Sequence, residues 1–174
     1  MNTLVKRGTF PGLAAIFIAF IYISGCQPMK SDPSQEMKPI ADKYLDVWNT
    51  GNLDELNSII DSSFVYMQNA EPQVMGLDGI KKEITQIRTA FPDLKITSEN
   101  LIYGENGWAV RWKLTGTNTG PGENPPTGKS VSVWGESIFQ VANGKLTKEF
   151  AVYDSQSFMQ QLGFTLMPPS EKKK

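Results

Sequence analysis

The chain has 174 residues, with 17 lysines and arginines against 18 aspartates and glutamates, one cysteine and no histidine. A nucleic-acid binding surface needs a basic face, so this balance predicts no nucleic-acid partner. The lack of histidine excludes Ser-His-Asp and Cys-His catalysis and the usual zinc ligand sets, and we therefore predict no metal site.

Residues 1–25 predict a signal peptide of the lipoprotein type. Lys6 and Arg7 precede the apolar run "LAAIFIAFIYI", which is shorter than the roughly 20 residues that a membrane span needs. The run is followed by "SGC", which resembles the end of the lipobox of bacterial lipoproteins, and its Cys26 is the only cysteine of the chain. The alternatives are an ordinary signal peptide with a stray cysteine, or a short membrane anchor.

Lipidation of Cys26 would hold the protein at a membrane of the cell envelope. Gln27 stands where an Asp would resemble an inner-membrane retention signal, so the outer membrane is favoured in an organism with two membranes. Residues 26–39 are polar and contain prolines, which predicts a lipid anchor and flexible tether. Residues 40–167 suit one domain, and residues 168–174 predict a disordered basic tail.

Helical periodicity dominates the first half of this domain. A first helix is predicted to end before Gly51, and a second, short helix over residues 53–60 to follow it. A short strand over residues 63–68 and a helix over residues 76–91 come next. The buried face of the first helix is predicted to carry Ile40, Tyr44, Val47 and Trp48.

Two-residue alternation replaces this pattern after Pro92. Four strand segments, residues 94–106, 107–120, 129–144 and 145–154, are separated by turns that contain Gly and Asn. A short helix follows Asp154. The order predicts an α+β fold in which a curved antiparallel sheet wraps around the N-terminal helices as a cone and encloses an apolar cavity.

Alternation along the strands predicts which side chains face the cavity. The second segment has the inward row Trp108, Val110, Trp112 and Leu114. In the last segment the apolar row comprises Leu146, Phe150 and Val152, and by parity it continues to Asp154. The opposite row is Thr147, Glu149, Ala151 and Tyr153. Asp154 is therefore predicted to point inward at the mouth of the cavity.

Four segments carry a resemblance to a known family. "GLDGIKKEI…AFPDLKI", "VRWKLTGTNTG", "PPTGKSVSVWGESIFQVANGKLTKEF" and "DSQSFMQQLG" resemble the SnoaL-like polyketide and ester cyclases in order and spacing. That family belongs to the NTF2-like superfamily, and the resemblance extends from about Ala41 to Phe164. It implies a cone-shaped domain and aldol chemistry without metal or cofactor, in which a buried acidic side chain removes a proton next to a carbonyl.

The resemblance also implies which residue is the acid. The Asp at the end of the last strand corresponds to Asp154. The family's usual histidines are replaced here by Met67, Asn118 and Glu149, and a second last-strand Asp is replaced by Ala151. The usual acid/base environment is therefore incomplete, and catalysis and binding without catalysis both stay open.

Each candidate residue also has a structural explanation. Asp154 is either the acid/base or the cap of the following helix. Arg111, Asn118 and Glu136 are candidate polar handles for a ligand, although an exterior cross-strand pair is the favoured explanation of Arg111 and Glu136. The aromatic and Met side chains predicted to line a ligand pocket, or alternatively to fill the core, are Tyr44, Trp48, Tyr66, Met67, Trp108, Trp112 and Phe150.

We therefore expect a membrane-anchored domain that binds a small apolar molecule, either carbonyl-bearing or aromatic. It would carry out cyclase or isomerase chemistry without a cofactor. The alternative is a non-catalytic module of a cell-envelope complex that holds a ligand or forms a homodimer through its open sheet face.

Overall fold

The computed structural model describes residues 32–69, 71–122, 125–165 and 167. Every described residue belongs to the second of the two units into which the chain divides, Ser31–Lys174. The predicted signal peptide, the predicted lipidation site Cys26 and the predicted basic tail lie outside the described residues.

The second unit contains four α-helices, one 3-10 turn and six strands within its described part. The helical elements are α1 (Pro33–Thr50), η1 (Leu53–Glu55), α2 (Leu56–Ile59), α3 (Gly76–Ala90) and α4 (Ser155–Gln161). The strands are β1 (Ile60–Gln68), β2 (Glu71–Met75), β3 (Lys95–Gly104), β4 (Gly107–Thr117), β5 (Ser130–Ala142) and β6 (Lys145–Tyr153).

Helix α1 begins earlier than the sequence pattern predicted. Asp32 caps it by accepting a hydrogen bond from the Ser34 backbone nitrogen at 3.0 Å, and Pro33 occupies the first turn, where its missing N–H costs no hydrogen bond. Met37 is only 4% exposed and extends the buried stripe by one turn. Residues 33–39 are therefore helical, and the predicted flexible tether does not extend to residue 39. The helix ends, as predicted, at Gly51, with φ of 78°.

The six strands form one sheet in the order β2-β1-β6-β5-β4-β3. Strands β3 to β6 form an antiparallel meander, as predicted, whereas β1 pairs with β6 in parallel. Strand β2 was not predicted. It contains Pro72 and lies at the edge of the sheet, where a proline removes no hydrogen bond from the interior.

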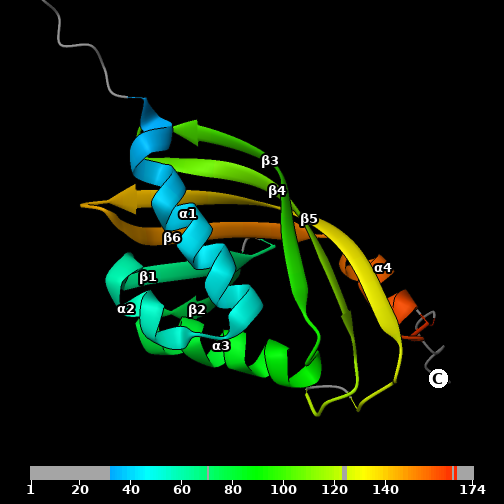
Figure 1. Ribbon diagram of the computed structural model, residues 1–174. Coiled ribbons are helices and arrows are strands. Elements are labelled where there is room, and N and C mark those ends of the chain that lie inside the picture. The colour runs from blue at the N-terminus through cyan, green and yellow to red at the C-terminus, as the bar shows by residue number, and fades with distance from the viewer. Residues whose placement is uncertain (1–31, 70, 123–124, 166, 168–174) are drawn as a thin grey trace, which may run out of the picture. The chain divides into compact units, whose positions relative to one another are not determined.

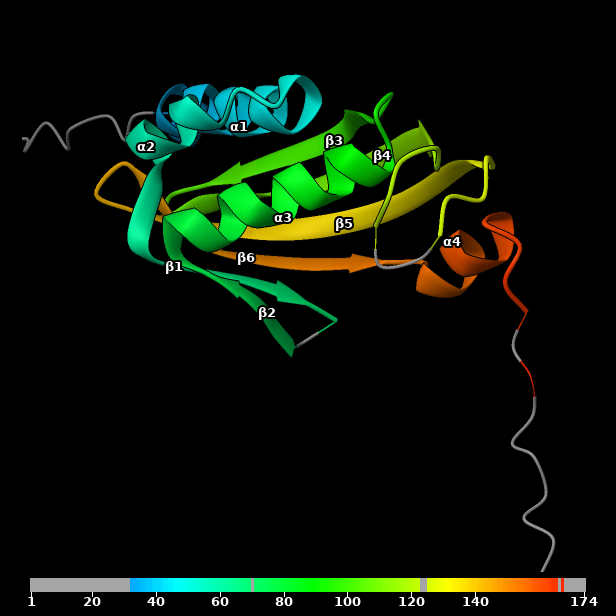
Figure 2. The same ribbon diagram turned by 90° about the horizontal axis from the view of Figure 1, so that it is seen from below.

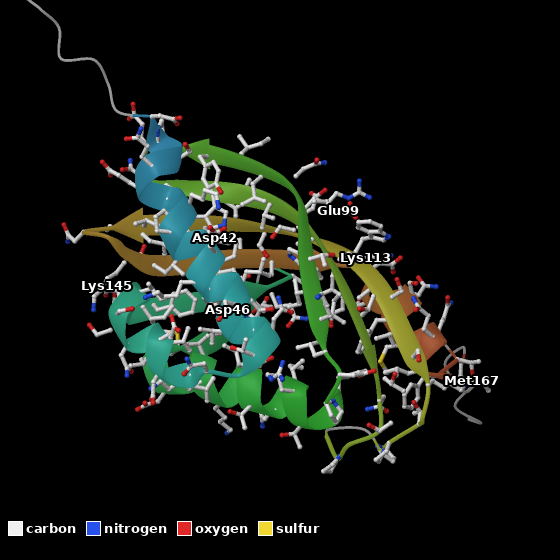
Figure 3. All side chains as sticks on the ribbon, viewed as in Figure 1. Asp42, Asp46, Glu99, Lys113, Lys145 and Met167 are labelled. Atoms are coloured by element: carbon white, nitrogen blue, oxygen red, sulfur yellow. The ribbon has the colours of Figure 1, made fainter. Side chains whose placement is uncertain are left out.

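Helices α1 and α3 lie on the same face of the curved sheet, and α4 lies at one end of β5 and β6 (Figures 1 and 2). The start of β6, marked by Lys145, and the C-terminal segment, marked by Met167, are at opposite ends of the sheet (Figure 3). The core between helices and sheet includes Val47, Leu56, Phe64, Ile80, Ile84 and Leu146, each 0% exposed. The predicted α+β fold is confirmed.

The hairpin between β5 and β6 determines which face of the sheet each later side chain of β6 occupies. Asn143 and Gly144 both have positive φ, 52° and 73°, as the two-residue turn that suits strand twist requires. Val141 then pairs with Leu146, but Gln140 pairs with Lys148, so Thr147 is an extra residue in β6. This irregularity is a β-bulge, and it reverses the alternation of side chains beyond it.

Candidate functional site

A cavity of about 320 Å³ lies between the helices and the concave face of the sheet. Ten aromatic side chains and several aliphatic ones line it. The predicted inward row of β4, residues 108 to 114, lines this cavity. Of the predicted pocket residues, the structure places five in its wall, namely Tyr44, Trp48, Tyr66, Trp108 and Trp112.

Two predicted pocket residues do not line this cavity. Met67 and Phe150 are register partners on the neighbouring strands β1 and β6, and Tyr66 and Ala151 next to them are the ones that face the cavity. The Lys148 Nζ lies 5.3 Å from the centroid of the Phe150 ring. The prediction of both as pocket residues was wrong. Met67 cannot share a face with its neighbour Tyr66, because side chains alternate along a strand. Phe150 was misplaced because the bulge at Thr147 shifts the alternation in β6.

The three predicted polar handles also lie elsewhere. Arg111 and Glu136 are exposed register partners on β4 and β5, and the Arg111 guanidinium lies 4.6 Å from the Trp134 ring centroid. Asn118 is buried, and its Oδ1 accepts hydrogen bonds from the Thr127 backbone nitrogen at 2.9 Å and hydroxyl at 3.1 Å. Asn118 therefore fixes the loop before β5, and the exterior explanation of Arg111 and Glu136 is the better one.

Asp154 does not line the cavity either. It is exposed, and its Oδ1 accepts a hydrogen bond at 2.8 Å from the backbone nitrogen of Ser157 in α4. It borders a shallow hollow that Arg111 and Glu136 also line. The prediction that Asp154 points inward was wrong, because it extrapolated parity from Leu146 through the bulge.

Glu149 is the buried carboxylate of the cavity wall. It is 6% exposed, and both of its oxygens accept hydrogen bonds from hydroxyl groups. Tyr44 of α1 donates to Oε2 at 2.7 Å, and Ser137 of β5 donates to Oε1 at 2.9 Å. Among the described residues, the ion pairs found involve Asp42 and Glu55 and not Glu149. Neutral donors therefore hold this buried acid.

Burial raises the pKa of Glu149 from 4.5 to about 7, and the hydrogen bonds from Tyr44 and Ser137 oppose the rise. Burial and the neighbouring Glu149 charge also raise the pKa of the Tyr44 and Tyr66 hydroxyls. Both tyrosines therefore remain protonated donors at neutral pH. A carboxyl group that titrates near pH 7 can accept or return a proton under physiological conditions.

One part of the cavity rim is charged and accessible to solvent. Lys38 and Asp42 of α1 form an ion pair there, and both side chains remain more than half exposed. Figure 3 shows Asp42 on α1. A ligand entering beside this pair would pass from a polar rim to an aromatic interior whose wall includes the buried Glu149 carboxyl group.

In the sequence, Glu149 stands out only as a replacement for a histidine of the resembling family, and strand alternation placed it on the outer face. The available signal was Ser137, a hydroxyl in the otherwise apolar or small inward row of β5. A polar group at such a position needs a buried partner. To find that partner on β6, one must know how β5 and β6 pair beyond Thr147. The alternation of apolar and polar residues in the sequence does not reveal this pairing.

A curved sheet with helices on its concave face and an apolar cavity between them defines an NTF2-like domain. The chain belongs to the SnoaL-like polyketide cyclase family, because the model of that family matches residues 38–162. No curated protein matches the chain at a significant level.

Solved structures share the fold. A protein assigned as a SnoaL-like polyketide cyclase from Jannaschia sp. has a TM-score of 0.67 and 20% identity, over 78% of this chain and 99% of that one. A protein assigned as a polyketide cyclase from Bacillus cereus has a TM-score of 0.65 and 23% identity, over 78% and 89%. A ketosteroid isomerase-like protein from Catenulispora acidiphila, in complex with trimethylamine, has a TM-score of 0.63 and 13% identity, over 76% and 99%.

Among the helices in the part of the chain that the structure describes, none combines the length and the apolar character needed to cross a membrane.

Proposed function

We propose that the cavity binds a small apolar molecule with a carbonyl group or an aromatic ring, and that Glu149 exchanges a proton with it. The observation that carries this proposal is the position of Glu149, a buried carboxyl group held by two neutral hydroxyls at the wall of an aromatic cavity. Membership of the SnoaL-like polyketide cyclase family supports the ligand class. This proposal replaces Asp154 with Glu149 as the acid/base.

The chemistry is abstraction of a proton from the carbon next to a carbonyl. The C–H bond breaks, the proton moves to Glu149, and the electron pair forms an enolate. In isomerisation, Glu149 returns the proton to a different carbon of a conjugated enolate. In ring closure, the enolate carbon attacks a second carbonyl of the same molecule, the π bond of that carbonyl breaks, and the resulting alkoxide takes the proton from Glu149. Tyr66, a protonated hydroxyl in the same wall, is the candidate donor to the enolate oxygen.

The test uses 2-tetralone, a small aromatic ketone with exchangeable protons next to its carbonyl. Proton NMR in D2O follows their exchange with and without protein. We expect the wild-type rate to exceed that of buffer, to rise with pH through about 7 and then to level. Glu149→Gln should lower the protein-dependent rate by about 10²-fold or more, because the substitution removes the base.

Two substitutions serve as controls for this experiment. Glu136→Gln removes an exposed carboxylate from the outer face, and Asp154→Asn changes the acid that the sequence favoured. Both should retain the wild-type exchange rate. Equal rates for wild type and Glu149→Gln would remove Glu149 from the chemistry. Binding of 2-tetralone, measured by tryptophan fluorescence, without any exchange would favour a module that only holds its ligand.

A second candidate role is self-association through the outer face of the sheet. This face exposes Trp134, Ile138 and Val152, with 38%, 57% and 52% of their surface accessible. It also carries Arg111 and Glu136, charges of both signs that suit a two-fold contact. Sedimentation equilibrium should then show a dimer that Ile138→Lys dissociates without changing the exchange rate. A wild-type monomer at all concentrations would exclude this role.

We further propose that Cys26 is lipidated and holds the domain at a cell-envelope membrane, with the outer membrane favoured where there are two. The support is the sequence alone, a basic and apolar leader followed by the only cysteine. Cells fed an alkynyl fatty acid should label the wild-type chain and not Cys26→Ala. Membrane fractionation should show the same difference, and a labelled Cys26→Ala chain would contradict the proposal.

A further inference from the structure

Three neighbouring strands carry a connected row of hydrogen-bond donors that ends at Glu149. Trp112 of β4 donates its indole Nε1–H to the Ser137 Oγ of β5 at 3.0 Å. Ser137 in turn donates to Glu149 Oε1 of β6 at 2.9 Å. Ser137 is 2% exposed, so water does not compete for its hydroxyl. The row therefore links an aromatic side chain of the cavity wall to the buried acid.

The direction of this row is fixed by the chemistry of its first member. An indole nitrogen can only donate a hydrogen bond, whereas a hydroxyl can donate one and also accept. Because Ser137 Oγ accepts from Trp112, its own proton remains for Glu149 Oε1. The indole thus holds the hydroxyl in the orientation that stabilises an ionised carboxylate, and successive bonds of this kind strengthen one another.

Gly135 makes the position of the indole possible. It is the register partner of Trp112 on β5, and Ser137 is the next inward residue of the same strand. A Cβ on Gly135 would lie 2.1 Å from Cζ2 of Trp112, so only a glycine leaves room for the ring. The indole therefore lies across β5 at the glycine and reaches the serine beyond it.

We propose that Trp112 is a positioning residue for Glu149, acting through the Ser137 hydroxyl, with Gly135 as the space that admits its ring. This inference rests on the proposed function only in calling Glu149 the acid/base. The hydrogen-bond row and its effect on Glu149 are independent of any turnover. Trp112 sets how readily Glu149 gives up its proton, and its aromatic surface also contacts the cavity.

The experiment is a titration of the Glu149 carboxyl carbon by 13C NMR in protein labelled at glutamate carboxyl groups, with Glu149→Gln used to assign the signal. Trp112→Phe removes the N–H donor and should raise the Glu149 pKa, by about half a unit to one unit, since the carboxylate loses part of one hydrogen bond. The matched control is Trp108→Phe. Trp108 lines the same cavity and stacks on Phe139 with ring centroids 4.5 Å apart. The Trp108→Phe substitution should leave the Glu149 titration unchanged.

A double-substitution cycle separates positioning from packing. Ser137→Ala should itself raise the Glu149 pKa, and adding Trp112→Phe to it should produce no further rise. A Trp112→Phe shift that persists in full in the Ser137→Ala background would overturn the proposal, as would a shift no larger than that of Trp108→Phe. If Trp112→Phe does not fold, 3-benzothienylalanine at position 112 keeps the bicyclic shape without the N–H and must give the same rise.

The outcomes distinguish the two proposals. If Trp112→Phe raises the Glu149 pKa as expected but the protein does not catalyse 2-tetralone exchange, the positioning role of Trp112 stands and the proposed chemistry is rejected. Exchange that depends on Glu149, with a titration indifferent to Trp112, would retain the chemistry and reject the positioning role.

Discussion

Strand β6 and the residue that follows it hold two acids that differ in burial and in hydrogen bonding. Glu149 faces the cavity, is 6% exposed and is held by two hydroxyls. Asp154, directly after the strand, is exposed and satisfies a backbone donor of α4. Their neighbours follow the same division, since Ala151 is 3% exposed and Val152 is 52% exposed. Burial is what raises the pKa of Glu149 to about 7.

The largest expected difference between the faces is in stability. Leu146→Ala removes a side chain that is 0% exposed and should lower the free energy of unfolding by roughly 2–5 kcal/mol through lost burial and a new cavity. Val152→Ala, on the outer face, should change it by no more than about 0.5 kcal/mol. Urea unfolding followed by tryptophan fluorescence measures both. Similar losses would mean that β6 does not separate a core from a surface.

The second prediction concerns pH. The folded pKa of Glu149, about 7, lies above its ordinary value of 4.5, so the folded state binds more protons in this window. The stability that Glu149 contributes is full below pH 4.5 and is lost as the pH rises through 7, by about 3 kcal/mol in all. Glu149→Gln should remove this part of the pH dependence.

Urea unfolding between pH 4.5 and pH 8 checks this prediction. The control is Glu136→Gln, which should retain the wild-type slope because Glu136 is exposed. A Glu149→Gln protein whose stability still falls by the wild-type amount would show that Glu149 is not the group that titrates in this window.

A smaller effect is expected at Asp154. Asp154→Ala removes the cap of α4 and should destabilise the protein by about 1 kcal/mol. Asp154→Asn, which retains a capping oxygen, should recover most of the loss. Thermal unfolding gives the stabilities, and the 2-tetralone exchange rate should stay at the wild-type value in both variants. A loss of exchange with intact folding would return Asp154 to the catalytic role that parity suggested.

The smallest effect is expected between Arg111 and Glu136 on the outer face. Because both are exposed register partners, their interaction should amount to a few tenths of a kcal/mol. A double-mutant cycle with Arg111→Ala and Glu136→Ala measures it. A coupling of roughly 2 kcal/mol or more would indicate a pair shielded from solvent, for example by a second copy of the chain.

Periodicity was sufficient to predict most of the fold. The helical stripe of α3 and the alternation in β4 arise from burial of one face, which a sequence records directly. Strand β2 was missed because Pro72 is unusual in a strand and is acceptable only at an edge. The start of α1 was missed because a single buried residue, Met37, extends its apolar face among polar neighbours.

The site was only partly predictable, for a different reason. Five aromatic lining residues followed from the pattern of α1, β1 and β4, but the acid did not. One extra residue, Thr147, shifts the alternation of side chains in β6. Because Phe150 and Val152 are apolar, a strand without a bulge fits the sequence pattern equally well. The choice is decided by the pairing with β5 and by the contact with Tyr44, which lies 105 residues away in the sequence.

The parallel pairing of β1 with β6 has a consequence for how the protein folds. Tyr44 and Glu149 are 105 residues apart, and the first strand finds its inner neighbour only when the last strand of the sheet has formed. Pairings of such long range close late and slowly, because the intervening chain must first be ordered. We therefore expect the acid site to be assembled late in folding, and until β1 and β6 pair, their strand edges are open to contacts between chains.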